Sequence, residues 1–259
     1  MPFQSLTARL ALAALGLGVA IAALAIMTVR LGAMDFTSAR QIMIPAVAFG
    51  VIALGLALAW MVSALRRNKG EAKRAGLIAL VGSLLFLWPP LHALYSGLTS
   101  PAIHDVSSDP DDPPSFVVLL KERGPHDNAP VFDNHDLTWR GETGNVSYIL
   151  HTFYGPNSGN PLTKPLALIM PPHRMFWRCF ETAKKMGWRL AAWDEKAGRI
   201  EAASTSFWFG QVSDISIRVR PAGRMGARFD IRAQKRSGDV DYGRNIRLIK
   251  AYRRRLNSM

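Results

Sequence analysis

Three long apolar stretches dominate the first hundred residues of the chain. Residues 10–29 and 42–65 contain no charged side chain, and residues 75–98 form a third stretch of the same kind. At about 1.5 Å per residue, a helix over each stretch can cross roughly 30 Å of hydrocarbon. The third stretch contains Pro89 and Pro90, and we expect its helix to continue through a kink there to Tyr95. The pattern predicts three transmembrane helices.

The pattern changes after residue 99. Between residues 100 and 165 the chain is rich in Pro, Asp, Asn and Gly, and its apolar runs, at 116–120 and 146–150, are short. Such a composition favours turns and irregular structure. We therefore expect a transmembrane region over 1–99 and then an irregular arm over 100–165, which holds a short helix and a short strand.

The remaining residues, 166–259, have the pattern of a small α+β domain. Apolar residues at helical spacing predict helices over 173–186 and 242–256. Tight turns between the strands imply an antiparallel four-stranded sheet with both helices packed on one face. Alternating apolar and polar positions place its four strands at 188–193, 199–208, 213–220 and 228–236.

The other face of the predicted sheet is rich in arginine. A turn symmetric about residue 224 sets Arg218 opposite Asp230 on the last two strands. The same register sets Arg220 opposite Arg228, which brings like charges face to face unless Glu201 on the neighbouring strand neutralises Arg220. Two interpretations stay open. One is a solvated face of salt bridges, and the other is a site for an anionic ligand, a lipid headgroup or an acidic partner.

Basic residues in the short loops predict the orientation in the membrane. The loop over residues 66–74 carries five Lys and Arg, whereas residues 30–40 carry two Arg and one Asp. Because basic loops stay in the cytoplasm, the second loop and the N-terminus are expected on that side. We therefore expect a multi-pass protein of the bacterial inner membrane whose C-terminal domain lies in the periplasm.

Positive charge is concentrated toward the C-terminus. From residue 218 onward, 13 basic residues face three acids. A nucleic-acid partner is not expected, because the domain is predicted to be periplasmic and no nucleic-acid-binding motif is present. The chain has one cysteine, Cys179, so an internal disulfide is excluded, and its expected place is the core.

Several motifs resemble a known bacterial family. The run IHDVSSD at residues 103–109, followed by PPSF at 113–116, is similar to the opening of domain of unknown function 1499. The resemblance covers about residues 102–256 and implies an envelope-associated domain, often joined to membrane spans, with no reaction and no ligand assigned. Later blocks resemble the same family in the same order, at residues 187–188, 198–202, 207–210, 214 and 232–245.

The chain also departs from that family pattern. The usual acid pair is reduced to Asp214 in the run QVSD at residues 211–214, and Ala233 and Lys235 replace two usual serines. These departures count against a catalytic or metal-binding role for the missing groups. The motif residues that remain in the last part are Arg232, Arg236, Gly238, Asp241, Gly243 and Asn245.

The segment before the last helix has two interpretations. In the structural one, Gly238 supplies a positive φ, Asp241 caps the helix and Asn245 bonds a nearby backbone group, with Asp214 and Gly243 as further motif residues. In the functional one, arginines beside a helix N-terminus form an anion site. The candidate ligand-binding residues are Arg218, Arg220, Arg228, Arg232, Arg236 and Asn245.

The arm offers a second group of candidates. His104, Asp105 and Asp109 have an oxygen-rich spacing that suits a divalent cation, although the Gly and Glu positions of an EF-hand loop are missing. The alternative is a set of turns held by Asp side chains next to prolines. We assign no catalytic residue and expect no cofactor.

The sequence contains no Ser-His-Asp order, HExxH motif, P-loop or Rossmann fingerprint. It therefore favours a non-enzymatic membrane protein whose periplasmic domain binds an anionic lipid or envelope polymer through the basic sheet face. Two alternatives stay open. One is an assembly protein that recognises another membrane protein, and the other is an envelope hydrolase or transferase that uses His104 and Asp105.

Overall fold

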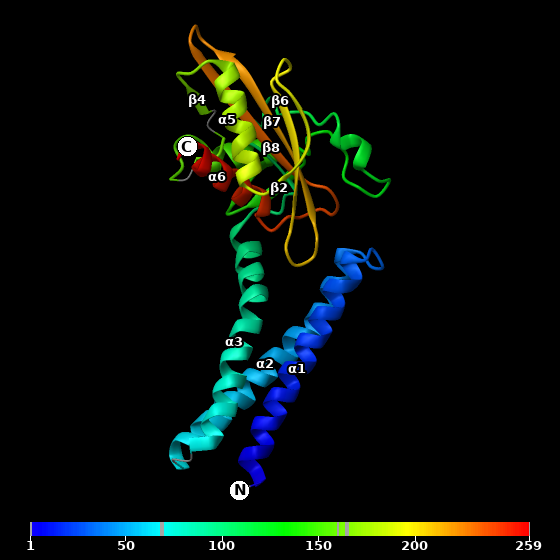
Figure 1. The fold of residues 1–259 in the computed structure, drawn as a ribbon, viewed down its shortest axis with the longest axis vertical. Coiled ribbons are helices and arrows are strands. Elements are labelled where there is room, and N and C mark those ends of the chain that lie inside the picture. The colour runs from blue at the N-terminus through cyan, green and yellow to red at the C-terminus, as the bar shows by residue number, and fades with distance from the viewer. Residues whose placement is uncertain (1, 68–69, 160, 164–165, 259) are drawn as a thin grey trace. The chain divides into compact units, whose positions relative to one another are not determined.

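The computed structural model describes residues 2–67, 70–159, 161–163 and 166–258. The chain forms two compact units (Figure 1). The first, which we call the helical unit, consists of Met1–Ser96 with Trp208–Gly210. The second, the α+β unit, consists of Gly97–Phe207 with Gln211–Met259.

Three long helices make up most of the helical unit. They are α1 (Pro2–Arg30), α2 (Phe36–Arg67) and α3 (Gly70–Thr99), and α3 continues through both of its prolines. Each contains a segment that is long and apolar enough to cross a membrane. The prediction of three membrane-capable helices is therefore confirmed. Those segments are Leu6–Arg30, Ser38–Leu65 and Arg74–Thr99.

Small side chains bring these helices together. Ala11, Ala57 and Ala79, one from each helix, are fully buried in one cluster. In a second cluster, Trp60 is buried beside Ala8. Large apolar side chains elsewhere on the helices are exposed. This is the arrangement expected of helices that pack through small residues and present their larger side chains to hydrocarbon.

The α+β unit is built on an antiparallel sheet (Figure 1). The four predicted strands are present, and their register is the predicted one. Arg218 pairs with Asp230, and Arg220 pairs with Arg228. The strands follow one another as β5 (Arg189–Asp194), β6 (Arg199–Thr205), β7 (Val212–Ala222) and β8 (Gly226–Lys235).

Within the described residues the sheet has six strands, so the predicted number of four was wrong. β1 (Asp105–Ser107) and β4 (Leu166–Leu168) pair with opposite halves of β8. Each has three residues, too few to show an alternating pattern among turn-forming residues. Together they cover the edge of β8, which would otherwise present a row of unpaired backbone groups.

Two helices cover one face of the sheet, as predicted (Figure 1). α5 (Pro172–Lys185) and α6 (Arg244–Asn257) share a hydrophobic core with β6, β7 and β8. The Tyr252 hydroxyl donates to the carbonyl oxygen of Cys179 at 2.8 Å and so joins the helices. Burial raises the pKa of the Cys179 thiol to about 12, so at neutral pH it is a protonated part of this core.

The arm is more regular than its composition predicts. After β1 it contains a 3-10 helix, η1 (Leu119–Glu122), a hairpin of β2 (Asp136–Trp139) and β3 (Glu142–Asn145), and helix α4 (Val146–Tyr154). The Asn145 side chain accepts a hydrogen bond from the Tyr148 N–H at 2.8 Å and so caps α4.

Two turn glycines with the same backbone conformation have different surroundings. Gly198, between β5 and β6, has φ +64, and a Cβ added there would lie 2.1 Å from the Val219 carbonyl oxygen. Gly223, between β7 and β8, has φ +65, and a Cβ there would meet nothing within 4 Å. Alanine at either position carries the cost of a left-handed backbone, about 1–2 kcal/mol. Only at Gly198 does it also collide with another strand.

We therefore expect Gly198→Ala to lower the free energy of unfolding by at least about 2 kcal/mol more than Gly223→Ala, because the backbone around Val219 must shift. The measurement is chemical denaturation of the full chain in detergent, followed by near-ultraviolet circular dichroism. Equal losses in the two variants would contradict the close packing of the β5 to β6 turn against β7.

Candidate functional site

The five sheet arginines proposed as anion ligands lie on the sheet face opposite α5 and α6. Every one of them is paired with a carboxylate of the chain itself. They fall into two groups, one of three residues and one of two. The sheet arginines are Arg218, Arg220, Arg228, Arg232 and Arg236.

The first group, the arginine–aspartate cluster, consists of Arg218, Arg220, Arg228, Asp109, Asp112 and Asp230. Arg220 lies 2.7 Å from Asp112 and 2.9 Å from the fully buried Asp230. Hydrogen bonds from Arg220 and Arg218 hold the pKa of Asp112 below its ordinary value. Three positive charges face three negative ones, so this cluster is electrically neutral.

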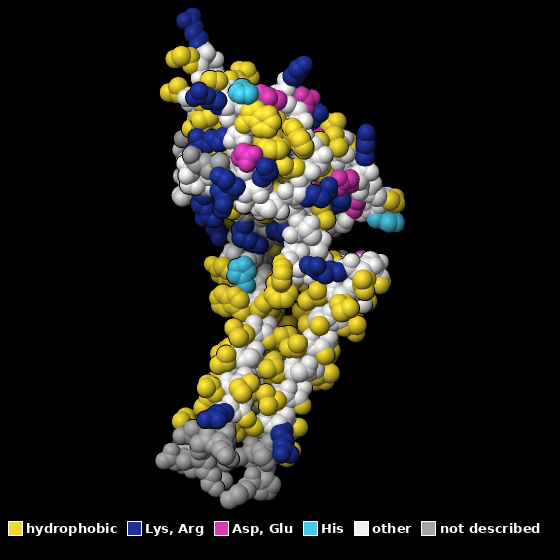
Figure 2. All heavy atoms as spheres, viewed as in Figure 1, with side chains coloured by type: hydrophobic (Ala, Val, Ile, Leu, Met, Phe, Trp, Pro, Cys, Tyr) yellow, Lys and Arg dark blue, Asp and Glu magenta, His cyan; other side chains and the backbone are white. Residues whose placement is uncertain are grey.

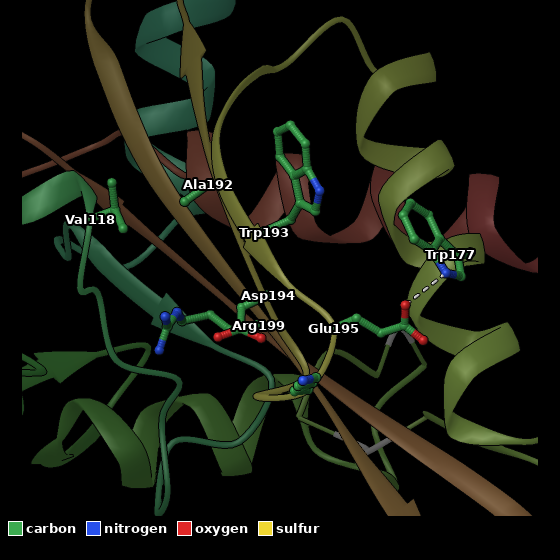
Figure 3. A pocket seen from close by; sticks show the side chains of 8 residues that line it. Val118, Trp177, Ala192, Trp193, Asp194, Glu195 and Arg199 are labelled. Carbon is green, nitrogen blue, oxygen red and sulfur yellow. Dashed lines mark hydrogen bonds between the residues drawn. The ribbon is translucent and has the colours of Figure 1, made fainter.

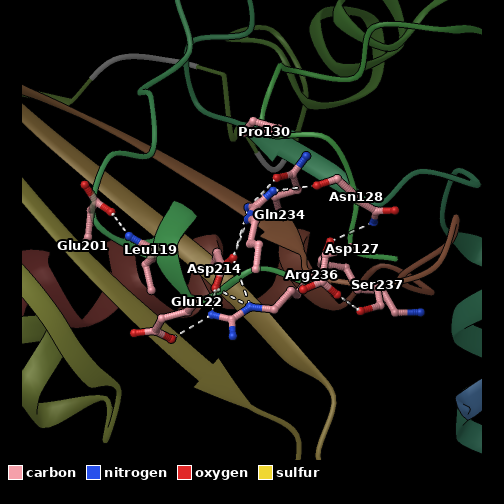
Figure 4. A network of polar contacts seen from close by, with 12 residues as sticks. Leu119, Glu122, Asp127, Asn128, Pro130, Glu201, Asp214, Gln234, Arg236 and Ser237 are labelled. Atoms are coloured by element: carbon pink, nitrogen blue, oxygen red, sulfur yellow. Dashed lines mark hydrogen bonds and ion pairs between the residues drawn. The ribbon is translucent and has the colours of Figure 1, made fainter. Parts of the chain in front are cut away.

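Glu201 does not neutralise Arg220, so that expectation was wrong. Its buried carboxylate accepts hydrogen bonds from the backbone N–H groups of Val117, Val118 and Leu119, at 2.9, 2.9 and 2.8 Å. Figure 4 shows the bond from Leu119. These donors lie at the start of η1. Glu201 therefore fastens the arm to β6, a role that the strand pattern around it does not reveal.

The second group, a largely buried network, consists of Asp105, Glu122, Arg123, Asp214, Arg232, Gln234 and Arg236. Figure 4 shows Glu122, Asp214, Gln234 and Arg236 of this network. Asp105 accepts two hydrogen bonds from Arg232, at 2.9 and 2.6 Å, and a third from Gln234 at 3.0 Å. Asp214 is fully buried and accepts from Arg123 at 3.0 Å and from Arg236 at 2.5 Å.

Burial acts strongly on this network. It raises the pKa of Asp105 above its ordinary value, and the hydrogen bonds and charge of Arg232 offset part of that rise. Burial alone would lower the pKa of Arg236, but the bonds and charges of Asp214 and Glu122 outweigh it and raise the pKa. Removing one partner from such a pair leaves a buried charge uncompensated, at a cost of about 3–5 kcal/mol.

The geometry of both groups serves to hold the arm on the sheet. The Arg232 side chain is 3% exposed and that of Arg236 is 16% exposed. An incoming anion would have to displace a carboxylate of the protein from either one. Arg218, Arg220 and Arg228 are less buried, but their charge is already balanced by Asp109, Asp112 and Asp230.

The segment before α6 is organised by Asp241. Its carboxylate accepts hydrogen bonds from the N–H groups of Gly243 at 2.7 Å and Asn245 at 2.8 Å. The Asn245 amide donates to the His104 carbonyl oxygen at 2.8 Å. Gly238 and Gly243 have φ of +88 and +70. These are the bonds and dihedrals that the structural interpretation predicts.

The candidates on the arm have separate partners. The His104 Nδ1 lies 3.3 Å from the Asp239 carbonyl oxygen and 3.4 Å from Asp133, whereas Asp105 pairs with Arg232. Asp109 belongs to the arginine–aspartate cluster. Within the residues that the structure describes, no three His, Cys, Asp or Glu side chains are grouped closely enough to hold a metal ion. The structure therefore does not bring His104, Asp105 and Asp109 together as one site.

The C-terminal helix α6 is a basic surface that the sequence analysis did not separate from the sheet arginines. Figure 2 shows Lys and Arg side chains over the part of the α+β unit where α6 lies in Figure 1. Arg247, Arg254 and Arg255 are exposed. The six basic residues of α6, which has no acid, are Arg244, Arg247, Lys250, Arg253, Arg254 and Arg255.

The basic residues of α6 are not held in ion pairs as those of the sheet are, although the charge of the buried Asp241 acts on Arg244 and Arg247. Among the described residues, none of the six is within 4 Å of a carboxylate, and their hydrogen bonds go to neutral groups such as the Tyr242 carbonyl and the Ser213 hydroxyl. Burial and the charge of Arg254 together lower the pKa of Lys250. Like charges thus repel one another along this helix.

Residues 105–256 match the family described as a protein of unknown function, DUF1499. The chain belongs to this family. The match runs from β1 to α6, so the DUF1499 region contains the acids of the arm, the sheet arginines and the basic helix. The resemblance seen in the sequence is confirmed. A search of the curated proteins finds no match.

Proposed function

We propose that this DUF1499 protein is a non-enzymatic, membrane-anchored binding protein whose α+β unit holds anionic lipid headgroups through α6. The observation that carries the proposal is the excess positive charge of this helix, which has six basic residues and no acid. Its six basic residues face no carboxylate within 4 Å among the described residues. A phosphate group supplies the negative charge that the fold itself does not.

The proposed anion site lies on α6, and not on the basic sheet face that the sequence favours. Each sheet arginine already has a carboxylate partner, and Asp105 and Asp214 are fully buried beneath the arm. A new anion gains little at a site whose charge is already balanced, because it must first break an existing pair. At α6 the same anion relieves repulsion between like charges.

A lipid headgroup is favoured over a soluble anion by the position of the helix. Residues 97–99, the last turn of α3, belong to the same unit as α6. A Cβ added at Gly97 would lie 3.1 Å from the Tyr242 ring, and one added at Gly243 would lie 2.1 Å from the Ser100 hydroxyl. The start of α6 thus adjoins the point where the chain leaves its third span. A basic residue near an anionic membrane surface contributes about 1 kcal/mol.

The membrane concerned is, in this proposal, the bacterial inner membrane. The basic loop at residues 66–74 supports a cytoplasmic N-terminus and a periplasmic α+β unit. Asn68 and Lys69 of this loop lie outside the described residues.

The triple variant Arg247→Gln, Arg254→Gln, Arg255→Gln tests the function. These side chains are exposed, so the fold should persist. We expect the preference of the full chain for phosphatidylglycerol over phosphatidylcholine to fall at least about tenfold, because three exposed positive charges that attract the anionic headgroup are lost. The measurement is native mass spectrometry of the detergent-purified chain with equal amounts of both lipids.

The matched control is Lys121→Gln, Lys185→Gln, Arg224→Gln, which removes three exposed charges elsewhere on the α+β unit. It should keep the lipid preference within about twofold, because these residues lie outside α6. If both triple variants keep the preference, the anion site is not on α6. A stoichiometric protein partner bound in place of lipid would instead support the role in membrane-protein assembly.

The orientation has its own test. A reporter enzyme that works only in the periplasm, fused after the C-terminus, should be active in a Gram-negative host. The same reporter inserted in the loop at residues 66–74 should be inactive, because that loop is expected in the cytoplasm. The reverse pair of results would place the α+β unit on the cytoplasmic side.

A further inference from the structure

A hollow of about 830 Å³ lies on the α+β unit, at the end of the β5 to β6 hairpin and beside α5 (Figure 3). None of the candidate anion ligands, on the sheet or on α6, is among the residues that line it. Two tryptophans contribute to its wall, Trp177 of α5 and Trp193 of β5, and they are 37% and 53% exposed. Half-exposed indole rings in a concave place are typical of binding sites, because they offer a large contact area at little conformational cost.

The two indole rings are held in place by an aromatic neighbour. The buried Phe180 packs edge-to-face against Trp177, with ring centroids 5.3 Å apart, and against Trp193, with centroids 5.2 Å apart. The Trp177 Nε1 also donates to the Glu195 carboxylate at 3.2 Å, as Figure 3 shows. The aromatic surface is therefore ordered before any ligand arrives, which lowers the entropy lost on binding.

Polar groups of both kinds surround this surface. Asp194 and Glu195 supply carboxylates, and Lys196 and Arg199 supply positive charges, all at the same hollow. Asp194 uses one oxygen to accept from the Ala197 N–H at 3.0 Å, which fixes the carboxylate at the turn. In Figure 3 the side chains of Asp194 and Arg199 lie next to each other in the space below Trp193. Hydrogen-bond acceptors and donors thus stand within one site.

An aromatic surface surrounded by charged groups of both signs suits one class of ligand better than others. A simple anion or cation would meet both attractive and repulsive charges here, and a purely apolar ligand would displace water from the charged groups without offering them a hydrogen bond in return. A sugar ring has an apolar C–H face that packs on an indole and a rim of hydroxyls that both donate and accept. The volume is within the range of about 300–1,000 Å³ for small-molecule sites.

From this geometry we infer that the hollow binds a short oligosaccharide, with one pyranose ring on Trp193 and its hydroxyls on Asp194 and Arg199. The site is separate from the anion site of α6 and does not depend on it. Through this site the α+β unit binds a glycan, and the three N-terminal helices anchor the chain in the membrane.

To test this, the full chain is titrated with chitotriose, cellotriose and maltotriose in a detergent without a sugar headgroup. Binding is followed by ligand-observed nuclear magnetic resonance. At least one trisaccharide should bind in the millimolar range or tighter. Trp193→Ala should weaken that binding at least about tenfold, because the stacking surface is lost. Trp193→Phe, which keeps a smaller ring, should restore part of it.

Phe207→Ala is the control, because Phe207 is an aromatic residue that is 78% exposed and lies outside the hollow. It should bind the sugar as the unchanged chain does. Arg199→Gln provides a second probe of the same site if Trp193→Ala lowers thermal stability. Binding of none of the three sugars at about 10 mM, or binding that Trp193→Ala and Arg199→Gln both leave unchanged, would overturn the inference.

Discussion

The buried ion pair of Asp105 and Arg232 is the interaction on which the rest of the α+β unit depends. A guanidinium and a carboxylate that are almost fully buried are tolerable only when each compensates the other. Because Asp105 belongs to β1 and Arg232 to β8, this requirement brings the start of the arm onto the edge of the sheet. Asp214 then holds the following residues of the arm through a second ion pair, with Arg123, and Glu201 holds them by accepting hydrogen bonds from backbone N–H groups. The covered face is neutral, and the unbalanced charge is left on α6.

The longer strands of the sheet could be predicted from the sequence pattern, and the shortest strands could not. Strands β5 to β8 and the pairing of Arg220 with Arg228 were predictable, because long alternating runs joined by tight turns fix one register. β1 and β4 could not be predicted, because a strand of three residues is too short to show an alternating pattern. Their positions depend on pairing with the edge of β8. The arm was predicted to be irregular for the same reason, since its order comes from bonds to distant strands.

In the candidate site, too, local contacts could be predicted from the sequence and long-range contacts could not. The bonds that Asp241 accepts from the N–H groups of Gly243 and Asn245 could be foreseen, because helix capping is local and uses residues a few positions apart. Arg232 pairs with Asp105, 127 positions earlier, so nothing near this arginine in the sequence shows that it is neutralised. Arg228 pairs with the nearby Asp230, but its second partner, Asp109, is 119 positions earlier. The basic residues of α6 are plain in the sequence, but their lack of ion pairs within the described residues is a property of the fold. The two tryptophans of the hollow likewise come from different elements.

A double-mutant cycle on Asp105 and Arg232 tests the central claim most directly. The free energy of unfolding is measured for the full chain, Asp105→Asn, Arg232→Gln and the double variant. Each single change should cost about 3 kcal/mol or more, and the double variant should cost at least about 2 kcal/mol less than the two costs added together. If the losses are additive and each lies below about 1 kcal/mol, as for an exposed ion pair, the pair does not hold the arm on the sheet.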